Sequence, residues 1–144
     1  SGIHKNKDLE VQLFVYDDLN LTEYEDFNVS DLDNYIDKQK INWINIHGLN
    51  NVEWLKSIGN YFEIDNFMLA DILNTTRRTK VEESHDFLFF NIKSLLPTEH
   101  SDNINVEQIS FLLILLPFSI FRKKRKFNYI HFHPDNIFIF FKLY

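Results

Sequence analysis

The residues that could do chemistry are spread along the chain rather than gathered in one motif. The 144 residues include six His and no Cys, which excludes thiol nucleophiles and Cys-ligated zinc. His131 and His133 would place two imidazoles on one side of a strand, as in a metal pair, but no third ligand lies near them in the sequence. Ser84, His85 and Asp86 have the residue types of a hydrolytic triad, whose members normally converge from separate parts of a fold. Neither pattern supports catalysis, and we expect no enzyme.

Composition and charge argue against some classes of ligand and binding partner. Three Gly and three Pro cannot supply a Gly-rich phosphate loop. The net charge of −6 divides into −11 for residues 1–110 and +5 for residues 111–144. An acidic body argues against nucleic acid as a partner. It is compatible with divalent cations, which prefer carboxylate oxygens, and also with acidity that serves only solubility.

Hydrophobic patterning alternates strands with helices. Strand periodicity or β-branched and aromatic composition predicts strands at 11–16, 21–27, 41–46, 87–96 and 106–113. Ser30, Asn51 and the segment 65–74 predict helices between them, with Val52 and Leu55 on the buried stripe of the second. This order predicts an α/β fold, an α/β/α sandwich with a mixed β-sheet.

In the helix predicted at 65–74, Asp71 is the acidic residue that we consider as a candidate cation ligand. Phe67 and Met68 are expected to face the core, and Asp71 lies three or four residues beyond them. Residues at that spacing share a helix face or lie at its border. From spacing alone, Asp71 could be a surface acid without a ligand or a carboxylate that binds a cation.

Residues 111–144 lack a sustained period and contain an unbroken basic run at 122–126. Aromatic and basic residues together could mark a patch for single-stranded nucleic acid or anionic lipid. We favour the alternative that this segment was never selected to fold. The longest apolar run, 109–121, is interrupted and falls short of the ~20 residues of a spanning helix.

Six short segments in order carry a family resemblance. The chain resembles the cytoplasmic N-terminal domain of CorA-type magnesium/cobalt transporters over about residues 10–113. The matching segments are WINIHG at 43–48, IGNYFEI at 58–64, LADILN at 69–74, RTKVE at 78–82, DFLF at 86–89 and EQIS at 107–110. The family usually has Pro at the position of Thr79 and often an acid at that of Ala70.

The resemblance implies a homo-pentameric channel in which regulatory Mg²⁺ between neighbouring subunits holds the closed state. Asp71 matches a metal-binding carboxylate that faces the next subunit, whereas Ala70 matches an accessory acidic position. The partner acids belong to a stalk helix that this sequence does not contain. The resemblance therefore implies weak Mg²⁺ binding and solubility for the fragment, and a place at the cytoplasmic face of the inner membrane for the full-length protein. It would be attached to the membrane only through the C-terminal segments absent here.

The resemblance also divides the chain. Residues 1–113 are expected to form a CorA-like cytoplasmic regulatory domain, and residues 114–144 an aberrant tail. The family's next strand ends in a motif resembling Phe-Gln-Glu-Lys. Codons for residues 120–124, read one base earlier, can encode x-Phe-Gln-Glu-Lys, so we hypothesise a frameshift. Genomic resequencing that shows an intact frame with this same tail would refute it.

The resemblance thus implies the metal-sensing domain of a Mg²⁺/Co²⁺ transporter, truncated before its stalk and pore. Two alternative functions remain open. One is a soluble interaction module that has lost transport. The other is the corresponding domain of a related zinc transporter. A stalk and a Gly-Met-Asn pore signature in the downstream gene sequence would support a transporter, and their absence would support the module.

Overall fold

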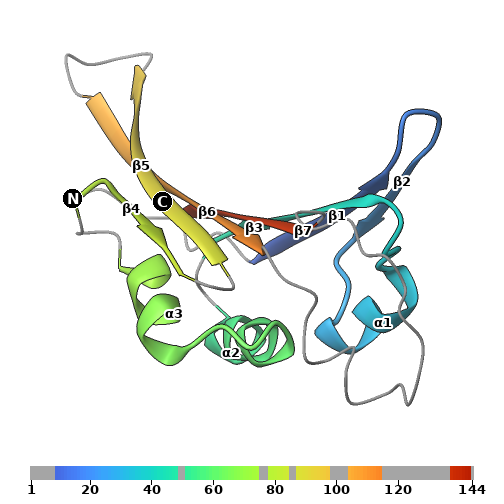
Figure 1. The fold of residues 1–144 in the computed structure, drawn as a ribbon. Coiled ribbons are helices and arrows are strands. Elements are labelled where there is room, and N and C mark those ends of the chain that lie inside the picture. Colours follow the sequence, from blue (N-terminus) through green and yellow to red (C-terminus); the bar gives the residue numbers. More distant parts are fainter. Residues whose placement is uncertain are drawn as a thin grey trace.

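In the part of the chain that the structure describes, seven strands form one curved sheet, and three α-helices pack against one face of it (Figure 1). The computed structural model describes residues 9–48, 51–74, 78–84, 87–97, 104–114 and 137–143. Its elements are β1 (Glu10–Tyr16), β2 (Leu21–Glu25), the short 3-10 helix η1 (Val29–Asp31), α1 (Leu32–Tyr35), β3 (Ile41–His47), α2 (Val52–Tyr61), α3 (Asn66–Leu73), β4 (Lys80–Glu83), β5 (Phe87–Pro97), β6 (Ile104–Ile114) and β7 (Ile137–Leu143).

The sheet is mixed, with strand order β2-β1-β3-β7-β6-β5-β4. The pair β3–β7 is parallel. The other five neighbouring pairs are antiparallel. A row of directly paired residues crosses the middle of the sheet through Ile44, Ile139, Leu112 and Phe89. The predicted α/β class with a mixed sheet is confirmed.

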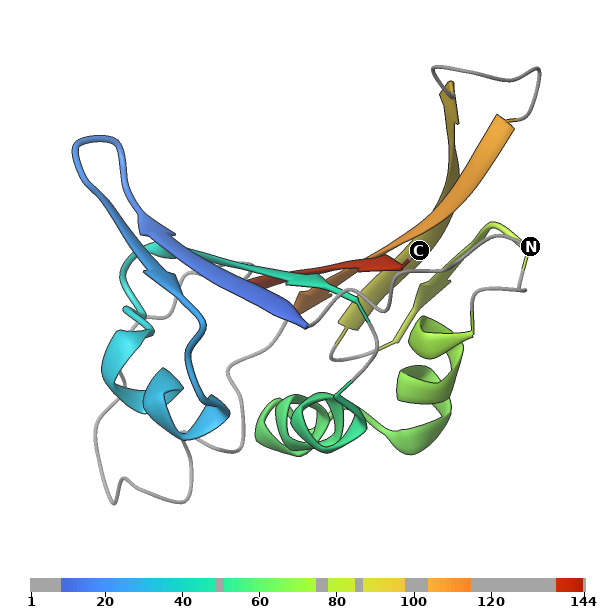
Figure 2. The same cartoon turned by 180° about the vertical axis from the view of Figure 1, so that it is seen from behind.

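The helices α1, α2 and α3 all lie on the same face of the sheet (Figures 1 and 2). Within the described ranges the molecule therefore has two layers, and the second helical layer of the expected α/β/α sandwich is not among them. The opposite face carries aromatic side chains, including Phe90 and Phe111, whose rings stack with centroids 4.7 Å apart. None of the helices in the described ranges is long and apolar enough to cross a membrane.

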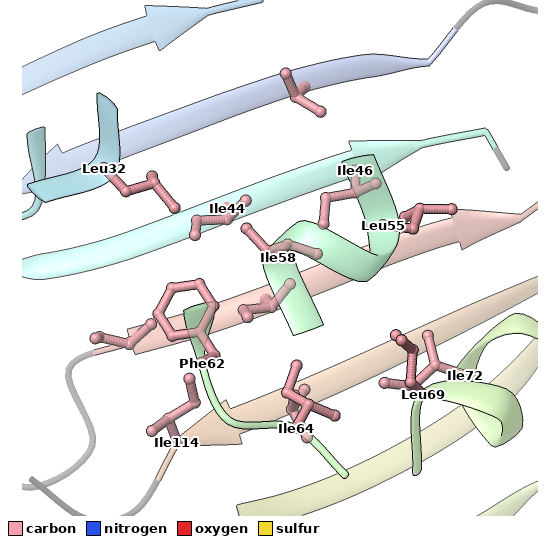
Figure 3. Packing of buried hydrophobic residues seen from close by; sticks show 14 of the residues in the cluster. Leu32, Ile44, Ile46, Leu55, Ile58, Phe62, Ile64, Leu69, Ile72 and Ile114 are labelled. Atoms are coloured by element: carbon pink, nitrogen blue, oxygen red, sulfur yellow. The ribbon is translucent and has the colours of Figure 1, made fainter. Parts of the chain in front are cut away.

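The core lies between the helices and the sheet (Figure 3). Alternate residues of the strands point into it, as Leu13, Ile44 and Ile139 do, and each is at most 1% exposed. From α2, Leu55 and Ile58 face these strands. Burial of such aliphatic side chains on the helix-covered face stabilises the two-layer arrangement.

Gly59 of α2 lies where the Leu69 side chain of α3 packs against it. A Cβ atom at this position would lie 3.0 Å from Leu69 Cδ2. That separation is shorter than an ordinary carbon–carbon contact. The absence of a side chain at Gly59 therefore lets α3 pack against α2.

Two expected core residues are instead exposed. Phe67 is 88% exposed on α3 and Val52 is 51% exposed on α2. In α3 the apolar residues occupy more of the helix circumference than the sheet can cover. Met68, Leu69 and Ile72 take the covered side, so Phe67 points away from it.

β7 lies within residues 114–144, the segment expected to be an aberrant tail. It fills the position between β3 and β6, with Ile137 and Ile139 buried. Across β6 and β7, Lys142 Nζ lies 3.3 Å from Glu107 Oε2. The rest of the tail, 115–136 and 144, falls outside the described residues, as do His131, His133 and two members of the triad pattern, His85 and Asp86.

Candidate cation-binding site

Local sequence fixes where α3 begins and ends. The Asp65 side chain accepts a hydrogen bond of 2.8 Å from the backbone N–H of Met68, which satisfies an otherwise free donor of the first turn. At the other end, the Gln108 side-chain amide donates a 3.0 Å hydrogen bond to the carbonyl of Asn74. Because β6 thereby holds the end of α3, the last helical turn and its Asp71 keep a fixed relation to the sheet.

Asp71 lies at the border of the buried side of α3, as its spacing from Met68 predicts. Its side chain is 16% exposed. The neighbouring Ala70 is exposed and offers no side-chain donor. Asp71 is therefore the carboxylate that this helix could present to a cation.

The Asp71 carboxylate contacts an ammonium from the neighbouring strand. Lys80 Nζ lies 2.5 Å from Asp71 Oδ2 and 2.7 Å from Glu82 Oε2. It also lies 5.5 Å from the ring centroid of Phe89. The hydrogen bond to Asp71, followed by that to Glu82, raises the pKa of Lys80 above its ordinary value of 10.5, so the side chain stays charged at neutral pH.

The backbone of Lys80 is held as firmly as its side chain. Its N–H donates a 2.8 Å hydrogen bond to Asn91 Oδ1, and Lys80 pairs in register with Asn91 across β4 and β5. Asn91, Gln108 and Ser110 form a buried polar group on the helix-facing side of the sheet. The side chains that hold the Lys80 backbone and the end of α3, Asn91 and Gln108, thus come from the two neighbouring strands β5 and β6.

Sequence reasoning singled out Asp71 and missed its contact with Lys80. The order RTKVE was visible in the sequence as a specific motif. The ion pair depends on where β4 lies beside α3, which residue spacing does not show. The strand alternation that places Lys80 and Glu82 on one side of β4 would have been the available signal.

The described part of one chain offers Asp71 to a Mg²⁺ ion, but no larger group of metal ligands around it. Mg²⁺ requires near-octahedral oxygen coordination and is usually held by one or two carboxylates with several waters. The described ranges contain no group of three or more His, Cys, Asp or Glu side chains that could hold a metal. Asp71 supplies a suitable carboxylate oxygen, but Lys80 already contacts it.

A second surface feature is a groove of about 740 Å³ on the helix-free face of the sheet. Its walls are mostly apolar and include Phe14, Leu21 and Trp43. The carboxylate among its lining residues belongs to Asp17, which accepts hydrogen bonds from the backbone N–H groups of Leu19 and Asn20. That carboxylate is committed to shaping the β1–β2 turn.

Asp17→Asn should remove a pH-dependent part of the stability. Hydrogen bonds from the Leu19 and Asn20 N–H groups, with a further contribution from Lys40, lower the pKa of Asp17 from 3.8 to about 2. A carboxyl whose pKa is lower in the folded state stabilises the fold above its unfolded pKa, and this contribution is lost as pH falls through the folded value. The wild type should therefore have the higher urea midpoint above about pH 4, and the difference should shrink toward about pH 2. An equal difference at both ends of this range would contradict the assignment.

The described part of the chain is thus a mixed α/β domain in which Asp71 of α3 forms an ion pair with Lys80 of β4. No family model matches it. Over 107 residues it is 26% identical to the cobalt/magnesium transport protein CorA of Thermotoga maritima, a match that covers 74% of this chain and 30% of that protein. The similarity is distant and spans under a third of the relative's length. It supports a CorA-like relationship.

Proposed function

We propose that this chain is the cytoplasmic metal-sensing domain of a CorA-like divalent-cation transporter. The observation that carries the proposal is the similarity to a cobalt/magnesium transport protein over 74% of this chain. The mixed α/β fold and the border position of Asp71 are consistent with it. Transport itself would be carried out by other parts of the full-length protein.

In the proposed role, Asp71 contributes one carboxylate to a regulatory Mg²⁺ site between subunits of a homo-oligomer, with five subunits as the family resemblance implies. A neighbouring subunit would supply further oxygen ligands, since the described part of one chain contains no group of three or more potential metal ligands. The positive charge of the bound ion would hold the Asp71 carboxylate and a ligand of the neighbouring subunit together. An isolated chain should accordingly bind Mg²⁺ very weakly.

Asp71→Ala in the full-length transporter should weaken closure by Mg²⁺. Loss of the carboxylate removes a ligand whose binding free energy favours the closed state. We expect the Mg²⁺ concentration for half-inhibition of transport to rise by roughly fivefold or more. Ion flux into vesicles, measured as a function of Mg²⁺ on the cytoplasmic side, gives this midpoint.

The matched control is Glu53→Ala, which removes an acid from the exposed surface of α2, where the side chain is 89% exposed. It should leave the half-inhibiting Mg²⁺ concentration unchanged. Equal midpoints in the wild type and Asp71→Ala would count against the proposed sensing role. Flux measured with Mg²⁺, Co²⁺ and Zn²⁺ in the same vesicles identifies the transported ion and tests the zinc alternative.

A further inference from the structure

Lys80 occupies the place beside Asp71 that an external cation would need. Its ammonium lies between two carboxylate oxygens, one from α3 and one from β4, at 2.5 and 2.7 Å. A lysine between two carboxylates provides the positive charge that a bound metal ion would otherwise provide. The carboxylates of Asp71 and Glu82 are therefore already paired with a positive charge from their own chain.

The position of this ammonium is built into the fold. Lys80 is the first residue of β4, and its N–H is bonded to the buried Asn91 side chain. The Lys80 and Asp71 side chains are 29% and 16% exposed. Partly buried charges are screened less by salt than fully exposed ones. The ion pair is thus a defined contact between α3 and the edge of the sheet.

A divalent cation and the Lys80 ammonium cannot both contact the Asp71 carboxylate without strong repulsion. Mg²⁺ binds carboxylate oxygens at about 2.1 Å, and Lys80 Nζ lies 2.5 Å from Asp71 Oδ2. Two positive charges would then lie within a few ångströms of each other in a partly buried place. Direct coordination therefore requires the ammonium to move away.

We propose that Lys80 is the resident counter-ion of Asp71 and that a divalent cation reaches this carboxylate only by displacing it. The inference rests on the proposed sensing role of Asp71 and adds how that site is regulated. Displacement breaks the contact between Asp71 of α3 and Lys80 of β4. Cation binding at Asp71 is thereby coupled to the attachment of the edge strand.

The test is a titration of the 144-residue chain with MgCl₂, followed by the NMR amide shifts of Asp71 and Glu82. The wild type should show very weak binding, whereas Lys80→Ala should lower the apparent Kd by about fivefold to tenfold, because the competitor is gone. Lys80→Arg keeps the charge and should bind as weakly as the wild type. Lys80→Ala combined with Asp71→Asn should lose the gain. If Lys80→Ala fails to fold, Lys80→Gln provides the uncharged side chain.

Equal Kd values in the wild type and the uncharged variant would overturn the counter-ion role, as would a gain that survives Asp71→Asn. The flux experiment on full-length Asp71→Ala is read separately. If Asp71→Ala weakens Mg²⁺ closure but removing Lys80 leaves the Kd unchanged, the counter-ion role fails and the sensing role stands. If Lys80→Ala binds Mg²⁺ more tightly but Asp71→Ala leaves closure intact, the sensing role fails.

Discussion

Ile139→Ala should lower the free energy of unfolding by about 2–4 kcal/mol, the cost of truncating a buried aliphatic side chain and leaving a cavity. Ile139 is 1% exposed in β7. It pairs directly with Ile44 on one side and Leu112 on the other. The substitution therefore weakens the strand that joins the two antiparallel parts of the sheet.

Urea unfolding followed by circular dichroism measures this loss. Leu19→Ala is the control, because Leu19 is 90% exposed in the β1–β2 turn, and its truncation should change stability by less than about 0.5 kcal/mol. A loss no larger than that of the control would mean that residues 137–143 do not belong to the folded core. The result therefore bears directly on whether the segment after residue 113 is an unselected tail.

Asn42→Leu should cost about 2–3 kcal/mol although it replaces a buried polar side chain by an apolar one of similar size. Asn42 is 0% exposed. Its amide group donates to the carbonyls of Asp37 and Lys40 at 2.7 and 2.9 Å, and its Oδ1 accepts from the Asp37 N–H at 3.0 Å. Leucine would leave these backbone groups without their partner, which costs more than the net value of the hydrogen bonds.

Chemical denaturation of two further variants tests whether the loss of stability comes from the buried hydrogen bonds of Asn42 or from replacing an Asn as such. Asn45→Leu changes a less buried Asn of the same strand, whose Oδ1 accepts from Trp43 Nε1, and should cost under about 1 kcal/mol. Asn42→Asp keeps the acceptor for Asp37 but removes the two donated bonds, so it should destabilise as well. Equal losses for Asn42→Leu and Asn45→Leu would show that the hydrogen bonds to the 37–40 turn contribute little.

Much of the fold could be predicted because its signals are local. Alternating side chains mark β1, Asn51 caps α2 as its position predicts, and α3 lies within the segment predicted at 65–74. These features depend on residues within a few positions of each other. Periodicity and capping are therefore sufficient to identify most elements and the α/β class.

What the sequence did not predict depends on contacts between distant segments. The exposure of Phe67 is decided by how α3 turns toward the sheet, since apolar residues surround most of that helix. The contact between Asp71 and Lys80 needs the placement of β4. The position of β7 depends on its pairing with β3, in which Asn42 pairs with Ile137, 95 positions later in the chain. Residue spacing alone carries none of these relations.

The central position of β7 has a consequence for how the chain folds as it is synthesised. β3 and β6 are both complete before the ribosome reaches Ile137, yet each needs β7 as its neighbour. Until then, both strands have unpaired backbone groups along one edge, and such edges recruit strands of other chains. The closing contact also joins residues far apart in sequence, which slows folding. The nascent chain is therefore prone to aggregate in the interval before β7 emerges.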